Sequence, residues 1–254
     1  MSRLITRTVR GNEELTQFFD ETARDYRDLH GPPEKLLQYR LAIIRPLIAG
    51  ANSESLLEIG CGTGIHLFAL ADQFTRVIGT DISPGMIEMA NATLESRKDR
   101  HKFSLAVDRA ECLSSICDKS IDVVLCVGAF EHMIDKRGVL FQIRRILQSG
   151  GIFVCLTPNG DSIWYRHWAP VLGLDTRHLS SDLYVTLPLI SEHMSDCGLQ
   201  LSESGNWTFV PAGDVNPALA LLLRVVDRAG RYLQIPAFRG GIYFKAVKPR
   251  SARI

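Results

Sequence analysis

The sequence of 254 residues predicts an α/β fold with a doubly wound, mostly parallel sheet of seven strands. Two observations indicate this fold. From about residue 55 onwards short apolar runs alternate with helical patterns, and a glycine-rich turn directly follows the first run. Strands that are joined by helices need right-handed crossovers and therefore lie parallel to one another. A hydrophobic fraction of 46% suffices for one sizeable core.

Residues 1–50 are predicted to form a helical cap, and residues 51–254 the sheet domain. Apolar residues at helical spacing begin at Leu15 and continue to Tyr26, and Gly31-Pro-Pro33 separates this helix from a second one that ends near Ala49. The predicted strands are 55–59, 76–80, 102–107, 121–127, 152–157, 199–204 and 241–247. The helices between them are 64–73, 84–97, 136–147 and 187–197, with Gly150-Gly151 expected to end the third.

Two insertions, at about 158–185 and 207–239, interrupt this alternation. The first carries Trp164, Tyr165 and Trp168 between two prolines, and the second is helical and apolar. One hypothesis is that the first insertion and the N-terminal helix close as a lid over a ligand, with the aromatic residues as the wall of an acceptor pocket. The alternatives are contact with a membrane surface and, as the simpler account, packing of the insertions against each other.

The charge balance argues against a general nucleic-acid binder, because 29 basic residues face 28 acidic ones. The six cysteines are scattered and predict reduced thiols. The N-terminal ten residues lack the apolar core of a secretion signal, and the apolar stretch 218–226 contains Arg224 and is too short for a membrane span. A cytoplasmic protein is expected, with membrane contact open but not expected and the oligomeric state undetermined.

A ligand site is predicted where the first strand meets the glycine-rich turn. Gly60, Gly62 and Gly64 allow a tight turn and a close approach of ligand to backbone, and the next helix would point its N–H groups at that ligand. Glu58 precedes the turn. Asp81 ends the second strand, where a ribose hydroxyl pair would lie. The glycine spacing differs from the dinucleotide pattern G-x-G-x-x-G.

At these positions the chain resembles the class I S-adenosylmethionine-dependent methyltransferases, a Rossmann-like fold. Within them it is similar to the small-molecule branch that includes the ubiquinone- and menaquinone-pathway enzymes. The matching segments are Leu56-Leu-Glu-Ile-Gly-Cys-Gly-Thr-Gly64, Gly79-Thr-Asp-Ile-Ser-Pro-Gly-Met-Ile87, Ile121-Asp-Val-Val-Leu-Cys-Val127, Phe130-Glu-His-Met133 and Leu147-Gln-Ser-Gly-Gly151. They lie within about residues 55–157, with a looser match at 186–205.

The resemblance implies S-adenosylmethionine as the cofactor. The three glycines would line its methionine part and ribose, Glu58 would hold the turn or face the ammonium group, and Asp81 would accept both ribose hydroxyls. Met86 would pack on the adenine or simply in the core, and Asp108 or Arg109 would stand at the adenine amino group. The full set of predicted cofactor-binding residues is Tyr26, Glu58, Gly60, Cys61, Gly62, Gly64, Asp81, Ile82, Met86, Asp108, Arg109 and Val127.

The candidate catalytic residues are Glu131, His132 and His178. Glu131-His132 follows the fourth strand, at the edge where α/β sheets carry their active sites, and a histidine suits general-base catalysis. The structural alternative is that the pair caps a helix or stabilises its loop. His178 could reach the mouth of the pocket or lie in a surface loop. No metal site is predicted, because Gly128 stands near the place where relatives carry an additional acidic residue.

The resemblance implies methyl transfer to oxygen, nitrogen or carbon of a small, partly apolar metabolite. The signature of adenine and cytosine methyltransferases is absent, since the place after the fourth strand is Val127-Gly-Ala-Phe130. A non-catalytic S-adenosylmethionine-binding regulatory or assembly protein is the alternative. A dehydrogenase on the same scaffold is disfavoured by the glycine spacing.

Overall fold

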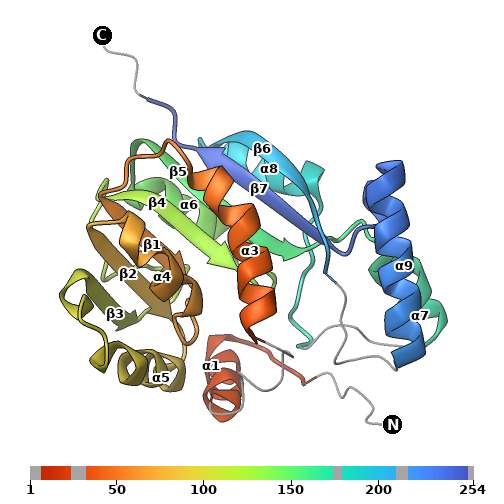
Figure 1. The fold of residues 1–254 in the computed structure, drawn as a ribbon, viewed down its shortest axis with the longest axis horizontal. Coiled ribbons are helices and arrows are strands. Elements are labelled where there is room, and N and C mark those ends of the chain that lie inside the picture. Colours follow the sequence, from red (N-terminus) through yellow and green to blue (C-terminus); the bar gives the residue numbers. More distant parts are fainter. Residues whose placement is uncertain (1–6, 24–32, 174–178, 210–216, 251–254) are drawn as a thin grey trace.

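A computed structural model describes residues 7–23, 33–173, 179–209 and 217–250, and these form one sheet with helices on both of its faces (Figure 1). The strands are β1 (Ser55–Ile59), β2 (Arg76–Asp81), β3 (Phe103–Val107), β4 (Ile121–Val127), β5 (Leu147–Pro158), β6 (Gln200–Trp207) and β7 (Gly241–Val247). Their order is β3-β2-β1-β4-β5-β7-β6. The pairs from β3 to β5 are parallel, and β7 is antiparallel to both β5 and β6. The predicted doubly wound, mostly parallel sheet of seven strands is confirmed.

The α-helices connect the strands or flank them. They are α1 (Asn12–Thr22), α3 (Pro33–Ile48), α4 (Ile65–Leu70), α5 (Pro84–Glu95), α6 (Lys136–Ile146), α7 (Ala169–Val171), α8 (Leu187–Asp196) and α9 (Pro217–Leu233). Short helical segments are η1 (Ala71–Gln73), η2 (Arg100–Lys102), η3 (Phe130–His132), η4 (Trp164–Trp168) and η5 (Pro236–Phe238). The glycines at 150–151 do not end α6 as expected, because Leu147 already pairs with Ile121 and β5 runs on through Gly150.

Two hydrophobic layers enclose the sheet. Helices α6 and α8 pack on one face, around Leu57, Val124 and Phe153, and helices α3 and α4 cover the other, around Leu56 and Val154. Every residue of β1 and of β4 is buried, as expected for central parallel strands covered on both sides. Their carboxyl ends are therefore held in fixed positions at one edge of the sheet.

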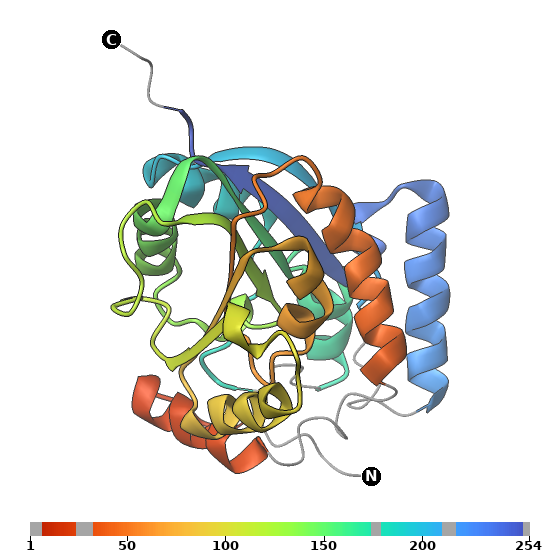
Figure 2. The same ribbon diagram turned by 60° about the vertical axis from the view of Figure 1, so that its left-hand side comes forward.

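The N-terminal segment is fastened at that edge by two contacts. Ser180 joins it to the first insertion, because its backbone N–H donates to Arg7 O (3.0 Å) and its Oγ accepts from Val9 N (2.8 Å). Asp20 of α1 accepts hydrogen bonds from Gly85 N (2.9 Å) and from the Ser83 hydroxyl at the start of α5. Helix α1 consequently lies across the carboxyl ends of the strands (Figure 2).

The aromatic residues of the first insertion pack against the second insertion. Trp164 and Ala169 form a cluster with Leu223 of α9, to which Tyr165 and Trp168 add partly buried surface. The simpler account of the insertions therefore agrees with the structure. None of the helices in the described part of the chain is long and apolar enough to cross a membrane. The proposed division at residue 50 stays a prediction.

Candidate active site

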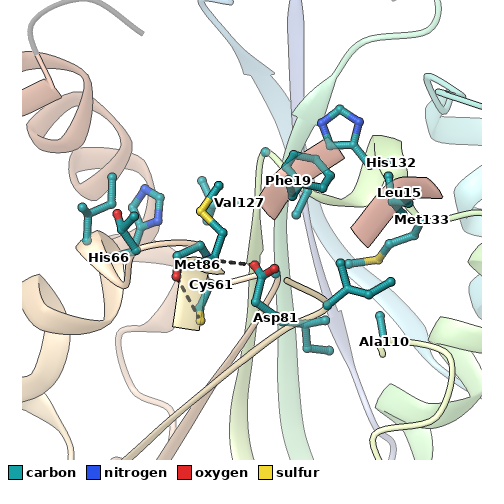
Figure 3. Close-up of a pocket in the computed structure, with 18 of the residues that line it drawn as sticks. Leu15, Phe19, Cys61, His66, Asp81, Met86, Ala110, Val127, His132 and Met133 are labelled. Carbon is teal, nitrogen blue, oxygen red and sulfur yellow. Dashed lines mark hydrogen bonds between the residues drawn. The ribbon is translucent and has the colours of Figure 1, made fainter. Parts of the chain in front are cut away.

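A cavity of about 330 Å³ opens at the carboxyl edge of the sheet, where α/β folds bind their ligands. Residues that follow β1, β2, β3 and β4 line it from below, and side chains of α1 and α3 cover it (Figure 3). The predicted site residues that line it are Gly60, Cys61, Gly62, Asp81, Ile82, Met86, Asp108, Val127 and His132. Residues from four loops, far apart in the sequence, thus share one cavity.

The glycine turn, residues 60–64, leaves room for a ligand. Gly60 has φ +66°, and a Cβ there would lie 2.5 Å from the Cβ of Ala129, so the turn packs directly on the loop after β4. At Gly62, with φ +52°, a Cβ would meet nothing within 4 Å. Because Gly62 also lines the cavity, the open space above it is where a ligand can press against the backbone.

Asp81 lies in the centre of the cavity and is fixed through its carboxylate. Its two oxygens accept hydrogen bonds from Gly62 N (2.8 Å) and Ser83 N (2.9 Å), which leaves each oxygen a further lone pair. Burial raises the pKa of Asp81 to about 6, against the opposing effect of these backbone hydrogen bonds. Burial, with the nearby Asp81 and Glu58 charges, also raises the pKa of the Cys61 thiol well above its ordinary value. Cys61 is therefore a neutral wall residue.

Asp108, which directly follows β3, is held in place by Ser115 of the loop after this strand. Its carboxylate accepts from Ser115 N (2.8 Å) and the Ser115 hydroxyl (2.7 Å). Arg109, the alternative for the same role, does not line the cavity, since its side chain is exposed and lies near Cys112. Between the two predicted residues, the structure brings Asp108 to the site.

Glu58 and Gly64 also do not form the cavity wall. Glu58 is fully buried behind the glycine turn, where Oε1 lies 2.9 Å from Nδ1 of His66. An ionised carboxylate can only accept, so in the neutral form of the ring Nδ1 carries the hydrogen and Nε2 keeps a lone pair. His66 itself lines the cavity, and its Nε2 has no hydrogen-bond partner among the described residues. Gly64 instead serves as the left-handed N-cap of α4, with φ +79°.

A second histidine–carboxylate pair stands at the opposite end of the cavity (Figure 3). His132 Nδ1 lies 2.6 Å from Oδ1 of Asp182, a buried residue of the first insertion whose other oxygen accepts from Leu179 N (3.0 Å). Burial lowers the pKa of His132, but the Asp182 hydrogen bond and the Glu131 and Asp182 charges outweigh it, and the net shift is upward. The ring of Phe19 packs edge-on against His132 at 5.3 Å.

Glu131 does not line the cavity but stabilises the loop that follows β4. Its Oε2 accepts from the Thr157 hydroxyl (3.0 Å), and its backbone oxygen accepts from Leu183 N and from the buried Lys136 ammonium. These bonds fix the loop that carries His132. Tyr26 and His178, the remaining predicted site residues, lie outside the described residues.

Several wall residues were not among those predicted. Arg40 of α3 brings a guanidinium to the cavity, 3.5 Å from the position that a Cβ would take at Gly128 and over the ring of Trp207. Leu15 and Phe19 of α1 give an apolar cover. Trp164 and Trp168 line a small separate hollow beside α9, and none of Trp164, Tyr165 and Trp168 lines this cavity, which favours the packing account over the acceptor-wall hypothesis. Among the described residues, no group of three or more His, Cys, Asp or Glu side chains could hold a metal ion.

Comparisons with known proteins agree with this site. Residues 57–155 match a family model described as a methyltransferase domain. The chain is 25% identical to thiol S-methyltransferase TMT1B of Rattus norvegicus, over 65% of this chain and 66% of that protein. It is 29% identical to the ubiquinone biosynthesis O-methyltransferase of Nitrosomonas europaea, over 60% and 63%. The chain thus spans less than two thirds of the length of these relatives.

The [4+2]-cyclase SpnF superposes with a TM-score of 0.70 over 99% of this chain and all of that one, and at 15% identity it shows a shared fold alone. Residues 57–155 are thus similar to a methyltransferase domain, which supports S-adenosylmethionine as the cofactor. The names of these two relatives describe methyl transfer to sulfur and to oxygen.

Proposed function

We propose that the protein transfers the methyl group of S-adenosylmethionine to a small, partly apolar acceptor, with His132 as the general base. The observation that carries the proposal is the His132–Asp182 pair in the same cavity as the glycine turn and Asp81. S-adenosylmethionine supplies the activated methyl group and leaves as S-adenosylhomocysteine.

The residues around Asp81 fit the nucleoside part of the cofactor. Both oxygens of Asp81 keep a lone pair for the ribose hydroxyls, and the Asp108 carboxylate would accept from the adenine amino group. Met86, buried and at the cavity wall, would pack against the adenine ring. The open face of Gly62 would take the part of the cofactor between ribose and sulfur.

The charged end of the methionine part has two candidates on the wall. His66 Nε2 would accept a hydrogen bond from the ammonium group, because Glu58 holds the hydrogen on Nδ1. Arg40 would attract the carboxylate, since it is the one Lys or Arg among the described wall residues. The first assignment gives the buried His66 Nε2 a hydrogen-bond partner, and the second places opposite charges together.

His132 would act on the acceptor. Asp182 orients the ring and holds the hydrogen on Nδ1, so Nε2 would take the proton of a hydroxyl or thiol while the methyl group is transferred to the resulting oxygen or sulfur. Phe19, Leu15 and Met133 give the acceptor end an apolar lining, which suits a partly apolar acceptor and excludes water. A small-molecule acceptor also suits the restricted volume of the cavity.

Product formation tests the proposal. The protein would be incubated with S-adenosylmethionine and single acceptors that represent alkyl thiols, phenols and amines, and S-adenosylhomocysteine would be measured by mass spectrometry. Turnover is expected with a thiol or a phenol. If calorimetry shows cofactor binding but no acceptor gives product, methyl transfer is refuted and the binding-protein alternative is supported.

A further inference from the structure

Helix α9 exposes an apolar face that the proposed reaction does not use. Five large side chains of this helix are between 50% and 88% exposed: Leu221, Leu222, Val225, Tyr232 and Leu233. Ala220, Leu223, Asp227 and Gly230 lie on the opposite, buried face. There Leu223 packs against Trp164 and Ala169 of the first insertion, and Asp227 bonds to Thr208 and Arg239. At 100° per residue, the five exposed side chains fall within one contiguous sector of the helix. A helix that only covers its own domain would carry polar residues there.

A stripe of three arginines borders this apolar face. Arg224, Arg228 and Arg231 are all exposed and repeat at the four- and three-residue spacing that aligns side chains along one side of a helix. In the described part of the chain none of the three forms an ion pair. The single acidic residue in the α9 sequence, Asp227, is buried and bonded to Thr208 and Arg239.

Two further exposed apolar side chains lie at the end of α7, the short helix that packs against the buried face of α9. Val171 and Leu172, at the end of α7, are 86% and 57% exposed, and Ala169 of α7 packs in the same cluster as Leu223. Both ribbon views place α9 at the periphery of the molecule (Figures 1 and 2). The helix has 17 residues, so its exposed side is roughly 25 Å long.

We propose that α9 lies on the surface of an anionic phospholipid bilayer, with its apolar face among the acyl chains and its arginines at the headgroups. Apolar side chains flanked by basic residues are the combination that an anionic interface binds, and the exposed Tyr232 suits the boundary between acyl chains and water. A second copy of the chain is a poorer occupant. If two α9 helices packed together, each copy would bring three arginines to the contact. No exposed acidic residue of α9 would be there to balance their charge.

Vesicle co-sedimentation tests this proposal and needs neither cofactor nor turnover, so it is independent of the proposed reaction. Binding is expected to phosphatidylcholine vesicles that contain about one third phosphatidylglycerol, and only weakly to pure phosphatidylcholine. The triple variant Arg224→Gln/Arg228→Gln/Arg231→Gln should bind on the order of 100-fold more weakly, from about fivefold per arginine. The variant Leu221→Ser/Leu222→Ser/Val225→Ser should lose at least about tenfold.

Matched controls separate a local effect from a general one. Phe141→Ser changes a side chain that is 52% exposed on α6, and Arg100→Gln changes an exposed arginine on η2; both should bind vesicles as the wild type does. Circular dichroism should show that all variants are folded. No vesicle binding by the wild type, equal binding to neutral vesicles, or unchanged binding by the α9 variants would each overturn the proposal. So would a dimer in solution that the Leu221/Leu222/Val225 variant converts to monomer.

Discussion

Two histidine–carboxylate pairs stand at the two ends of one cavity, and they differ in how they are built. Glu58 and His66 lie eight residues apart, with 2.9 Å between Oε1 and Nδ1, and both belong to the strand–turn–helix unit of the cofactor site. Asp182 and His132 lie fifty residues apart, with 2.6 Å between Oδ1 and Nδ1, and Asp182 comes from an insertion. Both carboxylate side chains are buried. The side chain of His132 is 14% exposed to solvent, whereas that of His66 is 5% exposed.

From this difference we infer that the two pairs have different roles, one in cofactor binding and one in methyl transfer. A local pair in a buried turn is suited to hold one fixed ligand, because its geometry is set together with the turn that carries the same ligand. In the proposed reaction, the pair assembled from a loop and an insertion faces the acceptor, and a raised pKa of His132 suits a group that exchanges protons. Changes at His132 and Asp182 are therefore expected to affect methyl transfer, and changes at Asp81 and His66 to affect cofactor binding.

The largest expected effect is that of His132→Asn. Loss of the general base should lower kcat/KM for a thiol or phenol acceptor by about 100- to 10,000-fold. The affinity for S-adenosylhomocysteine, measured by calorimetry, should stay within about twofold, because His132 belongs to the acceptor end. His101→Asn, at an exposed histidine on η2, is the matched control and should behave as the wild type. A large loss of cofactor affinity in His132→Asn would contradict the inference that His132 acts in methyl transfer and not in cofactor binding.

Asp182→Asn should have the next largest effect, lowering kcat by roughly 10- to 100-fold, because the ring of His132 loses its charged orienting partner. His132 must be neutral to accept a proton, so activity should rise with pH through its raised pKa. Without the Asp182 charge this pKa falls, and the midpoint of the pH profile should move to lower pH. A reduced rate with an unmoved midpoint would mean that Asp182 is only a structural support for its loop.

Asp81→Ala should weaken S-adenosylhomocysteine binding about ten- to 100-fold, since both ribose hydroxyls lose their acceptor. Asp72→Ala, at an exposed aspartate, is the control. The wild type gives a second test. The pKa of Asp81 is about 6 in the ligand-free protein, and ribose donors favour the ionised carboxylate, so affinity should fall as the pH drops through about 6. Affinity that does not change between pH 5 and 8 would contradict the assignment of Asp81, as would an unaffected Asp81→Ala variant.

The smallest expected effect is that of His66→Leu on cofactor affinity, a loss of about five- to tenfold for one hydrogen bond to a charged group. His66→Gln keeps an acceptor in the same region and should retain more of the affinity. Turnover at saturating cofactor should be unchanged in both variants. If His66→Leu instead lowers kcat at saturating cofactor, the two pairs do not differ in the way proposed.

Much of the fold was predictable because it depends on local pattern. The strands at Ser55–Ile59 and Gly241–Val247 were predicted at their observed limits, since short, mostly apolar runs between turn residues indicate inner strands. The glycine turn and Asp81 were predictable for a related reason, because their spacing is fixed by one strand–turn–helix unit.

The other half of the site depends on contacts that leave no local pattern. Asp182 meets His132 only after the first insertion has folded back, and Arg40 reaches the cavity from a helix whose partner, Trp207, is far away in the sequence. His66 had a usable signal, since it is the one polar residue in the apolar helix Ile65–Leu70. For the aromatic residues at 164–168 the sequence left an acceptor wall and insertion packing both open, because it does not show that α9 packs on them.

The close packing of Gly60 on Ala129 also constrains how this chain can change over generations. A methyl group at position 60 would lie 2.5 Å from the one at position 129, so the two sites cannot both carry side chains. Gly60 also has φ +66°, so a glycine at position 129 would remove the clash but not the backbone strain of a side chain at position 60. Position 60 is therefore expected to stay glycine over generations, whatever small residue stands at 129.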